Sequence, residues 1–251
     1  MDHWLAMLLT FNFTLLISSC GLDVEDPTPP LPPIWVEKSL PEEWPEKGID
    51  AHESGGIYLE WKPNIEEDIV AYNIYRATWF DVNDSLGDYD LIVSVELESI
   101  PELEYIDNGA NAMTKYYYKL KAQDGADNLS VDSDSLVYSL HPALPASTMS
   151  PNGISDTLDA ERLLSWRYNY RIAMEDYCLT ILSEENEFIT RILLSPSNYV
   201  GWDESWQIPA VILLEPDQVY FWRIDTGAGY VDDMETAGSE SQWASFVYRG
   251  K

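Results

Sequence analysis

Beyond Pro33 the chain is a series of short stretches in which apolar and polar side chains alternate, and no long stretch has helical spacing. In the run IYLEW, Ile57, Leu59 and Trp61 share one face, and the run YYYKLKA at 116–122 alternates in the same way. A period of two, rich in aromatic and branched residues, is typical of strands with one buried face. Regular strands separated by turn residues predict an all-β sandwich or barrel.

The same pattern of aromatic residues occurs twice along the chain. In each half a Trp is followed by a Tyr eleven residues later and by a second Tyr 55 or 54 residues later: Trp61, Tyr72 and Tyr116, then Trp166, Tyr177 and Tyr220. A repeat of about 105 residues has the size of a small sandwich domain and is too long for a solenoid unit. The repeat predicts tandem domains at 34–140 and 141–251, with the proline-bearing segment 141–147 as their hinge.

The second half also carries a recognisable turn signature. In LLEPDQVYFWRI, Leu214, Pro216 and Tyr220 follow the pattern L-x-P-x-x-x-Y of a tyrosine corner, whose phenol bonds back to nearby backbone. Tyr116 takes the equivalent place in the first half, where the leucine and proline are missing. With these residues the chain resembles tandem fibronectin type III domains. The resemblance implies two tandem immunoglobulin-like β-sandwiches.

The N-terminal segment has the character of an export signal. Residues 4–17 are almost wholly apolar, and as a helix they would span roughly 21 Å, short of a ~30 Å hydrocarbon core. The following Ile-Ser-Ser-Cys resembles the lipobox of bacterial lipoproteins, which implies a signal peptide at 1–19 and a lipid on Cys20. The start departs from the signal pattern, because residues 1–3 carry no lysine or arginine. The alternatives are an ordinary signal peptide with a chance cysteine and a buried apolar segment.

Residues 20–33 form the expected linker between the lipid and the first domain. Five prolines lie between positions 21 and 33, and such sequence favours extended polyproline II structure. With Cys20 lipidated, only Cys178 keeps a thiol, so no disulfide can form within the chain. We therefore expect a lipid-anchored protein of the bacterial cell envelope, on the outer membrane or cell surface.

Charge narrows the possible partners. The chain has 14 basic and 44 acidic residues, for a net charge of −30. Such a surface repels nucleic acid phosphates and anionic lipid headgroups. Solubility explains the charge most simply, and cation binding is the alternative.

Four aromatic residues outside the core pattern are candidates for ligand binding. Trp79 and Phe80 open the polar stretch at 78–90, which we expect to be a loop, and Trp202 and Trp206 lie between expected strands. Exposed rings beside carboxylates can stack on sugars or anchor a protein partner. The alternative is that these rings fold back over the edge of the sandwich.

The same loop offers oxygen ligands at alternate positions, but it fits a calcium loop poorly. Leu86 and Ile92 stand where a helix-flanked calcium loop needs glycine and glutamate. The sequence has no HExxH, GxSxG or phosphate-binding glycine loop, and Cys178 has no histidine near it. We therefore predict no metal site, cofactor or catalytic residue.

Together these features predict a non-enzymatic, lipid-anchored envelope protein. Its sandwiches would present loops to a protein or glycan partner, as in an adhesion or binding module. The alternative is an accessory carbohydrate-binding lipoprotein that uses exposed tryptophans as a flat platform. Fold class does not choose between them, because such sandwiches serve many functions.

Overall fold

The computed structural model describes most of the chain beyond the expected leader, and its regular structure is β apart from one 3₁₀ turn, η1 (Ala146–Thr148). The described residues are 27–37, 47–97, 103–158, 161–169, 176–195, 203–231 and 234–250. The expected signal peptide, Cys20 and Trp202 lie outside them. No helix in the described part is long and apolar enough to cross a bilayer. The all-β fold class is confirmed.

The first domain packs two antiparallel sheets face to face. One sheet contains β1 (Ile34–Trp35), β2 (Ile49–Ala51), β3 (Ile57–Lys62) and β7 (Glu104–Asp107). The other contains β4 (Ile69–Phe80), β5 (Ser85–Leu86), β6 (Asp90–Glu96), β8 (Thr114–Asp124) and β9 (Leu136–Leu140). Buried and half-buried residues alternate along β3 and β8, as one inward face requires.

The second domain repeats this plan. Its small sheet contains β10 (Met149–Ser150), β12 (Leu163–Trp166) and β15 (Glu204–Gln207). Its larger sheet contains β11 (Thr157–Leu158), β13 (Asp176–Ser183), β14 (Phe188–Leu194), β16 (Gln218–Val231), β17 (Met234–Glu240) and β18 (Ala244–Tyr248).

Each sandwich encloses its own aromatic core. The ring centroids of Trp61 and Tyr72 lie 5.5 Å apart in the first core, and those of Trp166 and Tyr177 lie 5.5 Å apart in the second. All four side chains are buried. Buried rings of this size remove roughly 150–250 Å² each from water, which supplies much of the stability of a domain without disulfides.

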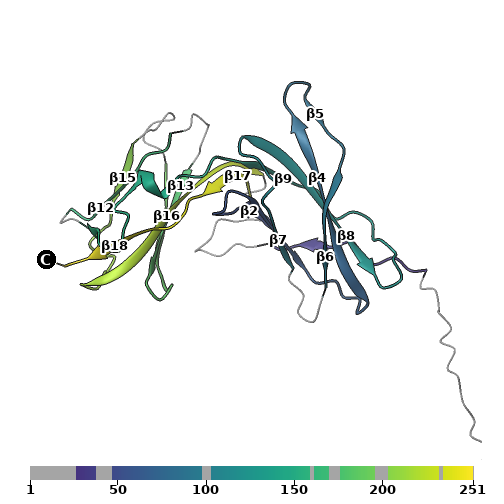
Figure 1. The fold of residues 1–251 in the computed structure, drawn as a ribbon, viewed down its shortest axis with the longest axis horizontal. Helices are drawn as coiled ribbons and strands as arrows, with labels where there is room; N and C mark the ends of the chain where they lie inside the picture. The colour runs from purple at the N-terminus through teal and green to yellow at the C-terminus, as the bar shows by residue number, and fades with distance from the viewer. Residues whose placement is uncertain are drawn as a thin grey trace, which may run out of the picture.

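The larger sheets of the two domains join into one continuous sheet (Figure 1). Strand β17 runs parallel to β9, with Ala237 opposite Ser139 and Gly238 opposite Leu140. The main-chain N–H of His141 adds a 2.7 Å hydrogen bond to the Gly238 carbonyl. The segment that the sequence predicts as a hinge thus begins with a main-chain contact between the domains.

Candidate functional site

A tyrosine hydroxyl holds the chain just before a long strand in each domain. The Tyr220 hydroxyl accepts a 2.7 Å hydrogen bond from the Glu215 N–H, and the Tyr116 hydroxyl accepts one of 3.0 Å from the Asn111 N–H. Both bonds reach back five residues. Leu214 is buried beside the second corner, whereas Pro216 is exposed. The first corner forms its bond without the leucine and proline of the signature.

Trp79 and Phe80 lie in a strand, so the prediction that they belong to a loop is wrong. They are the last two residues of β4, where Trp79 pairs with Leu86 and Phe80 pairs with Ser85 of β5. Aromatic residues favour the extended backbone, so the strand continues past the point where the polarity of the sequence suggests a loop. Only residues 81–84 form the connection, and Asp84 closes it at a φ of 49°.

The Trp79 ring rests on its neighbours rather than standing free. Its centroid lies 6.0 Å from that of Tyr117, with the rings tilted by 39°. The Lys115 ammonium lies 5.3 Å from the Trp79 centroid, within range of a cation–π contact. Trp79 is therefore half-buried on the outer side of the first domain's larger sheet, where Tyr117 and Lys115 cover part of its ring.

The end of the β4–β5 hairpin stands clear of both sandwiches and carries apolar side chains among polar ones (Figure 1). Three side chains, which we call the hairpin tip, remain open to solvent: Phe80 is 49% exposed, Val82 101% and Leu86 39%. A methyl group added at Gly87 would lie 2.9 Å from the Phe80 ring. Phe80 therefore packs over Gly87, which fixes the direction of its ring.

Trp206 forms part of the wall of the second domain. It lies in β15, opposite Leu164 of β12, and packs against the second core while staying partly exposed. The structure therefore does not bring Trp206 together with Trp79 and Phe80, which belong to the first domain. Trp202, the remaining aromatic candidate, lies outside the described residues.

A groove of about 860 Å³ opens near the C-terminal end of the second domain, lined in part by Arg162, Arg249 and Tyr248. The Arg249 guanidinium lies 2.7 Å from the Asp217 carboxylate. Arg162 donates a 2.8 Å hydrogen bond to the Ile212 carbonyl and lies over the Tyr248 ring. Both guanidinium groups are thus engaged with the protein itself.

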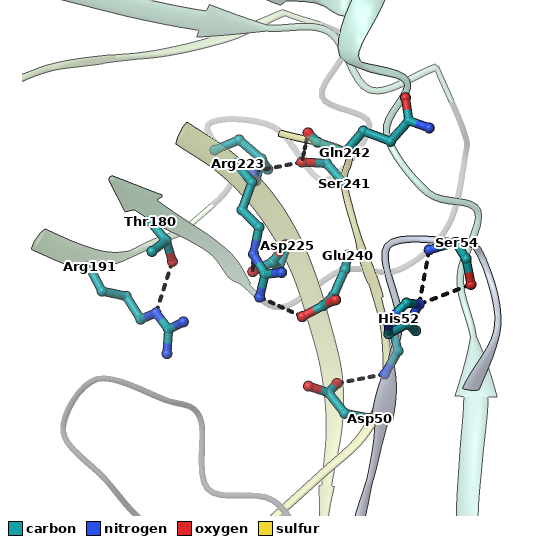
Figure 2. Close-up of polar contacts among 12 residues, drawn as sticks. Asp50, His52, Ser54, Thr180, Arg191, Arg223, Asp225, Glu240, Ser241 and Gln242 are labelled. Carbon is teal, nitrogen blue, oxygen red and sulfur yellow. Dashed lines mark hydrogen bonds and ion pairs between the residues drawn. The ribbon is translucent and has the colours of Figure 1, made fainter. Parts of the chain in front are cut away.

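A charged cluster lies where the second domain meets the first (Figure 2). Arg223 of β16 places Nε 3.0 Å from Asp225 Oδ2 and Nη2 2.5 Å from Glu240 Oε1. Asp225 and Glu240 face each other across β16 and β17 as register partners. We call Arg223, Asp225 and Glu240 the junction cluster; their side chains are 15%, 8% and 13% exposed.

Burial shifts the pKa values of three side chains where the two domains meet. It raises the pKa of Glu240 to about 8, with the neighbouring Asp225 carboxylate adding to the effect. It also raises the pKa of Asp225, against the attraction of Arg223. Burial lowers the pKa of His141, which directly follows β9 of the first domain, to about 4. Three groups at one junction, Glu240, Asp225 and His141, are therefore shifted toward their neutral forms.

Sequence reasoning missed the junction cluster for a clear reason. Arg223 and Asp225 alternate with the core residues Trp222 and Ile224, so they lie on the outward face of β16. Charged residues on an outward face are normally solvated. They are buried here because β17 and the first domain's β2 lie beside them, which depends on contacts between the domains (Figure 2).

Two aromatic-cored sandwiches with tyrosine corners and a shared sheet define a tandem β-sandwich protein. No protein-family model and no curated protein matches the chain. Similar solved structures include the chicken CNTN1 FN1–FN3 domains, 13% identical over 88% of this chain and 68% of that one, with a TM-score of 0.34. A two-domain fibronectin type III segment of chicken tenascin is 16% identical over 88% of this chain and 99% of its own, with a TM-score of 0.28.

A β-1,2-glucanase from Parabacteroides distasonis is also similar over part of its length. The two chains are 27% identical over 46% of this chain, with a TM-score of 0.32. The matched region is 14% of the glucanase, so this chain corresponds to only a small part of that protein.

Proposed function

We propose that this chain is a non-catalytic binding protein of the bacterial cell envelope, and that it presents the hairpin tip of its first domain to a protein partner. One observation carries the proposal: Phe80, Val82 and Leu86 are all exposed at a projecting tip. Leu86 lies on the face of Trp79, and Phe80 lies on the opposite face. Apolar side chains grouped on an otherwise polar surface mark sites of association. Burying them gains roughly 25 cal/mol for each Å² removed from water.

The surroundings of the tip favour a protein over a lipid surface. Asp81 and Asp84 flank Val82 in the connection, and the chain as a whole has a net charge of −30. These charges oppose contact with an anionic bilayer but suit a partner whose pocket has a basic rim. The pairing of β4 with β5 and the packing of Phe80 over Gly87 hold the tip in shape before it binds.

In this proposal a lipid on Cys20 confines the protein to the membrane and the proline-rich linker sets its reach. The end of the linker is bound to the first domain, because the Leu31 N–H donates to Glu66 Oε1 at 2.7 Å and the Asn64 side chain donates to the Leu31 carbonyl at 2.8 Å. Confinement raises the local concentration at the surface, so that weak contacts become effective. Mass spectrometry of the mature N-terminus tests the anchor: a lipidated Cys20 supports it and an unmodified chain contradicts it.

The binding surface is tested by photo-crosslinking on intact cells. A photoreactive phenylalanine analogue at Val82 is expected to give one defined protein adduct, and Phe80→Ser should abolish it. The same analogue at Val211, 83% exposed in the second domain, serves as the control. Equal adducts from both positions, or an adduct unaffected by Phe80→Ser, would contradict the proposal.

The alternative of a carbohydrate-binding lipoprotein rests on Trp79, whose half-buried ring lies between Tyr117 and Lys115. A glycan array with the wild type, Trp79→Ala and Phe80→Ser separates the two functions. Saccharide binding that disappears in Trp79→Ala and persists in Phe80→Ser would favour the carbohydrate function over protein binding at the tip.

A further inference from the structure

The seam between the domains brings carboxylates of both domains together. Asp50 on β2 of the first domain and Glu240 on β17 of the second lie on neighbouring strands (Figure 2). Asp50 Oδ1 accepts hydrogen bonds from the Ala51 N–H at 2.7 Å and the Tyr138 hydroxyl at 3.1 Å, which fix it to the first domain. Arg223 fixes Glu240 to the second.

The charges around Glu240 balance when the facing pair of Asp225 and Glu240 holds one proton. Within the described residues Glu240 faces Asp225 and Arg223 of β16 and Asp50 of β2, and Arg191 of β14 acts on Asp225 from the far side. Without a charge on Glu240, the guanidinium groups of Arg191 and Arg223 face the same number of carboxylates, those of Asp50 and Asp225. An ionised Glu240 adds a third carboxylate, buried between two others and close to the seam. Like charges at low dielectric repel strongly.

We propose that Glu240 is a proton-dependent latch between the two domains: its neutral form lets β17 lie against β2 and β9, and its ionised form weakens this contact. The seam is the element that responds, because Asp50 and Glu240 belong to different domains and can separate without unfolding either core. Opening moves β17 away from Asp50 and gives the Glu240 carboxylate access to water. No covalent change is needed.

The pH range in which the latch acts follows from the shifted pKa values of Glu240 and His141. Glu240 has its ordinary pKa of 4.5 when exposed and about 8 at the closed seam, so its contribution to closure is full below pH 4.5 and is lost as the pH rises through 8. His141 has an ordinary pKa of 6.5 and about 4 when buried, so its contribution is present above pH 6.5 and is lost as the pH falls through 4.

The two contributions largely offset each other between pH 4.5 and 6.5, and from there to pH 8 the Glu240 contribution dominates. Between pH 6.5 and 8 the Glu240 contribution raises the opening equilibrium about sixteenfold and the remaining His141 contribution lowers it about twofold, so the open fraction should rise about eightfold. At higher pH it should level off, because Glu240 is then ionised in both forms.

Hydrogen exchange of the His141 amide measures opening directly, because its N–H bonds to Gly238 across the seam. After correction for the intrinsic exchange rate, protection of this amide in the wild-type chain should fall about eightfold between pH 6.5 and 8. Glu240→Gln should remove the dependence, and Glu187→Gln, an exposed control, should retain it. The core amides of Tyr118 in the first domain and Trp222 in the second are measured in parallel to show that both variants stay folded.

A second variant keeps the test decisive if Glu240→Gln does not fold. Asp50→Asn removes the carboxylate across the seam and should reduce the pH dependence of His141 protection. Protection that is equally pH-dependent in the wild type and in the folded seam variants would overturn the proposal. So would wild-type protection that does not change between pH 6.5 and 8.

Discussion

The Tyr220 hydroxyl accepts a hydrogen bond from the main-chain N–H of Glu215 at 2.7 Å. Tyr220 is also buried against Phe246, with ring centroids 5.5 Å apart. One side chain therefore both fills the second core and fixes the turn into β16. The same strand continues to the seam, so this corner supports the position of the junction cluster.

Tyr220→Phe keeps the ring and removes only the hydroxyl. The free energy of unfolding of the second domain should fall by about 1 kcal/mol, the usual net value of one hydrogen bond. Tyr116→Phe should have a similar effect on the first domain, because its hydroxyl bonds to the Asn111 N–H. Urea unfolding followed by tryptophan fluorescence measures both, and an unchanged midpoint in both variants would exclude a stabilising role for the corners.

Gly48 should be far less tolerant of alanine than Gly55. Both have positive φ, 58° and 83°, so a left-handed backbone lowers the free energy of unfolding of each alanine variant by about 1–2 kcal/mol. A methyl group at Gly48 would also clash with the Glu60 carbonyl oxygen, whereas one at Gly55 meets nothing within 4 Å. Thermal unfolding should show the larger loss for Gly48→Ala, and equal losses would contradict this packing.

Arg223→Met should destabilise the second domain by about 3–5 kcal/mol, because it leaves buried Asp225 without its nearest cation and Glu240 without a hydrogen-bond donor. The matched control is Arg249→Met, which removes an ion pair with Asp217 whose side chains are 58% and 69% exposed. That surface pair should cost at most about 1 kcal/mol. Chemical denaturation of both variants gives the comparison, and similar small losses would show that the junction cluster is solvated.

Cys178 should be inert to thiol reagents in the folded protein. Burial raises the pKa of its thiol to about 12, and the nearby Asp225 carboxylate adds to the shift, so little thiolate forms at pH 8. In a Cys20→Ser chain, an aromatic disulfide reagent should react fully in urea and only at the rate of unfolding without it. Immediate labelling of the folded chain would show that Cys178 is accessible.

The sequence was sufficient for features that depend on local alternation. Trp61 and Trp166 could be assigned to two cores because strands with one buried face leave a period of two in the sequence. The course of β4 through Trp79 and Phe80 was missed, because the polar residues that follow suggested that the strand had already ended. Polar residues in a sequence indicate exposure to solvent, and the residues of a projecting hairpin are as exposed as those of a loop. Polarity alone therefore does not separate the two.

The seam could not be predicted because it depends on contacts between distant segments. The stretch METAGSE, which forms β17, has small and polar residues rather than strong strand formers. It becomes a strand by pairing with β16 and β9. The burial of Glu240 follows from that pairing, so nothing within its own stretch of sequence distinguishes it from the many acidic residues at the surface.

The distance between spin labels in the two domains tests the shared sheet most directly. Labels at Ile65→Cys and Val211→Cys, both 83% exposed in the native chain, would be placed in a Cys20→Ser chain and measured by pulsed electron resonance at pH 6.5. A continuous sheet through β9 and β17 predicts a single narrow distance distribution. A broad distribution, as two sandwiches on a flexible hinge would give, would contradict it.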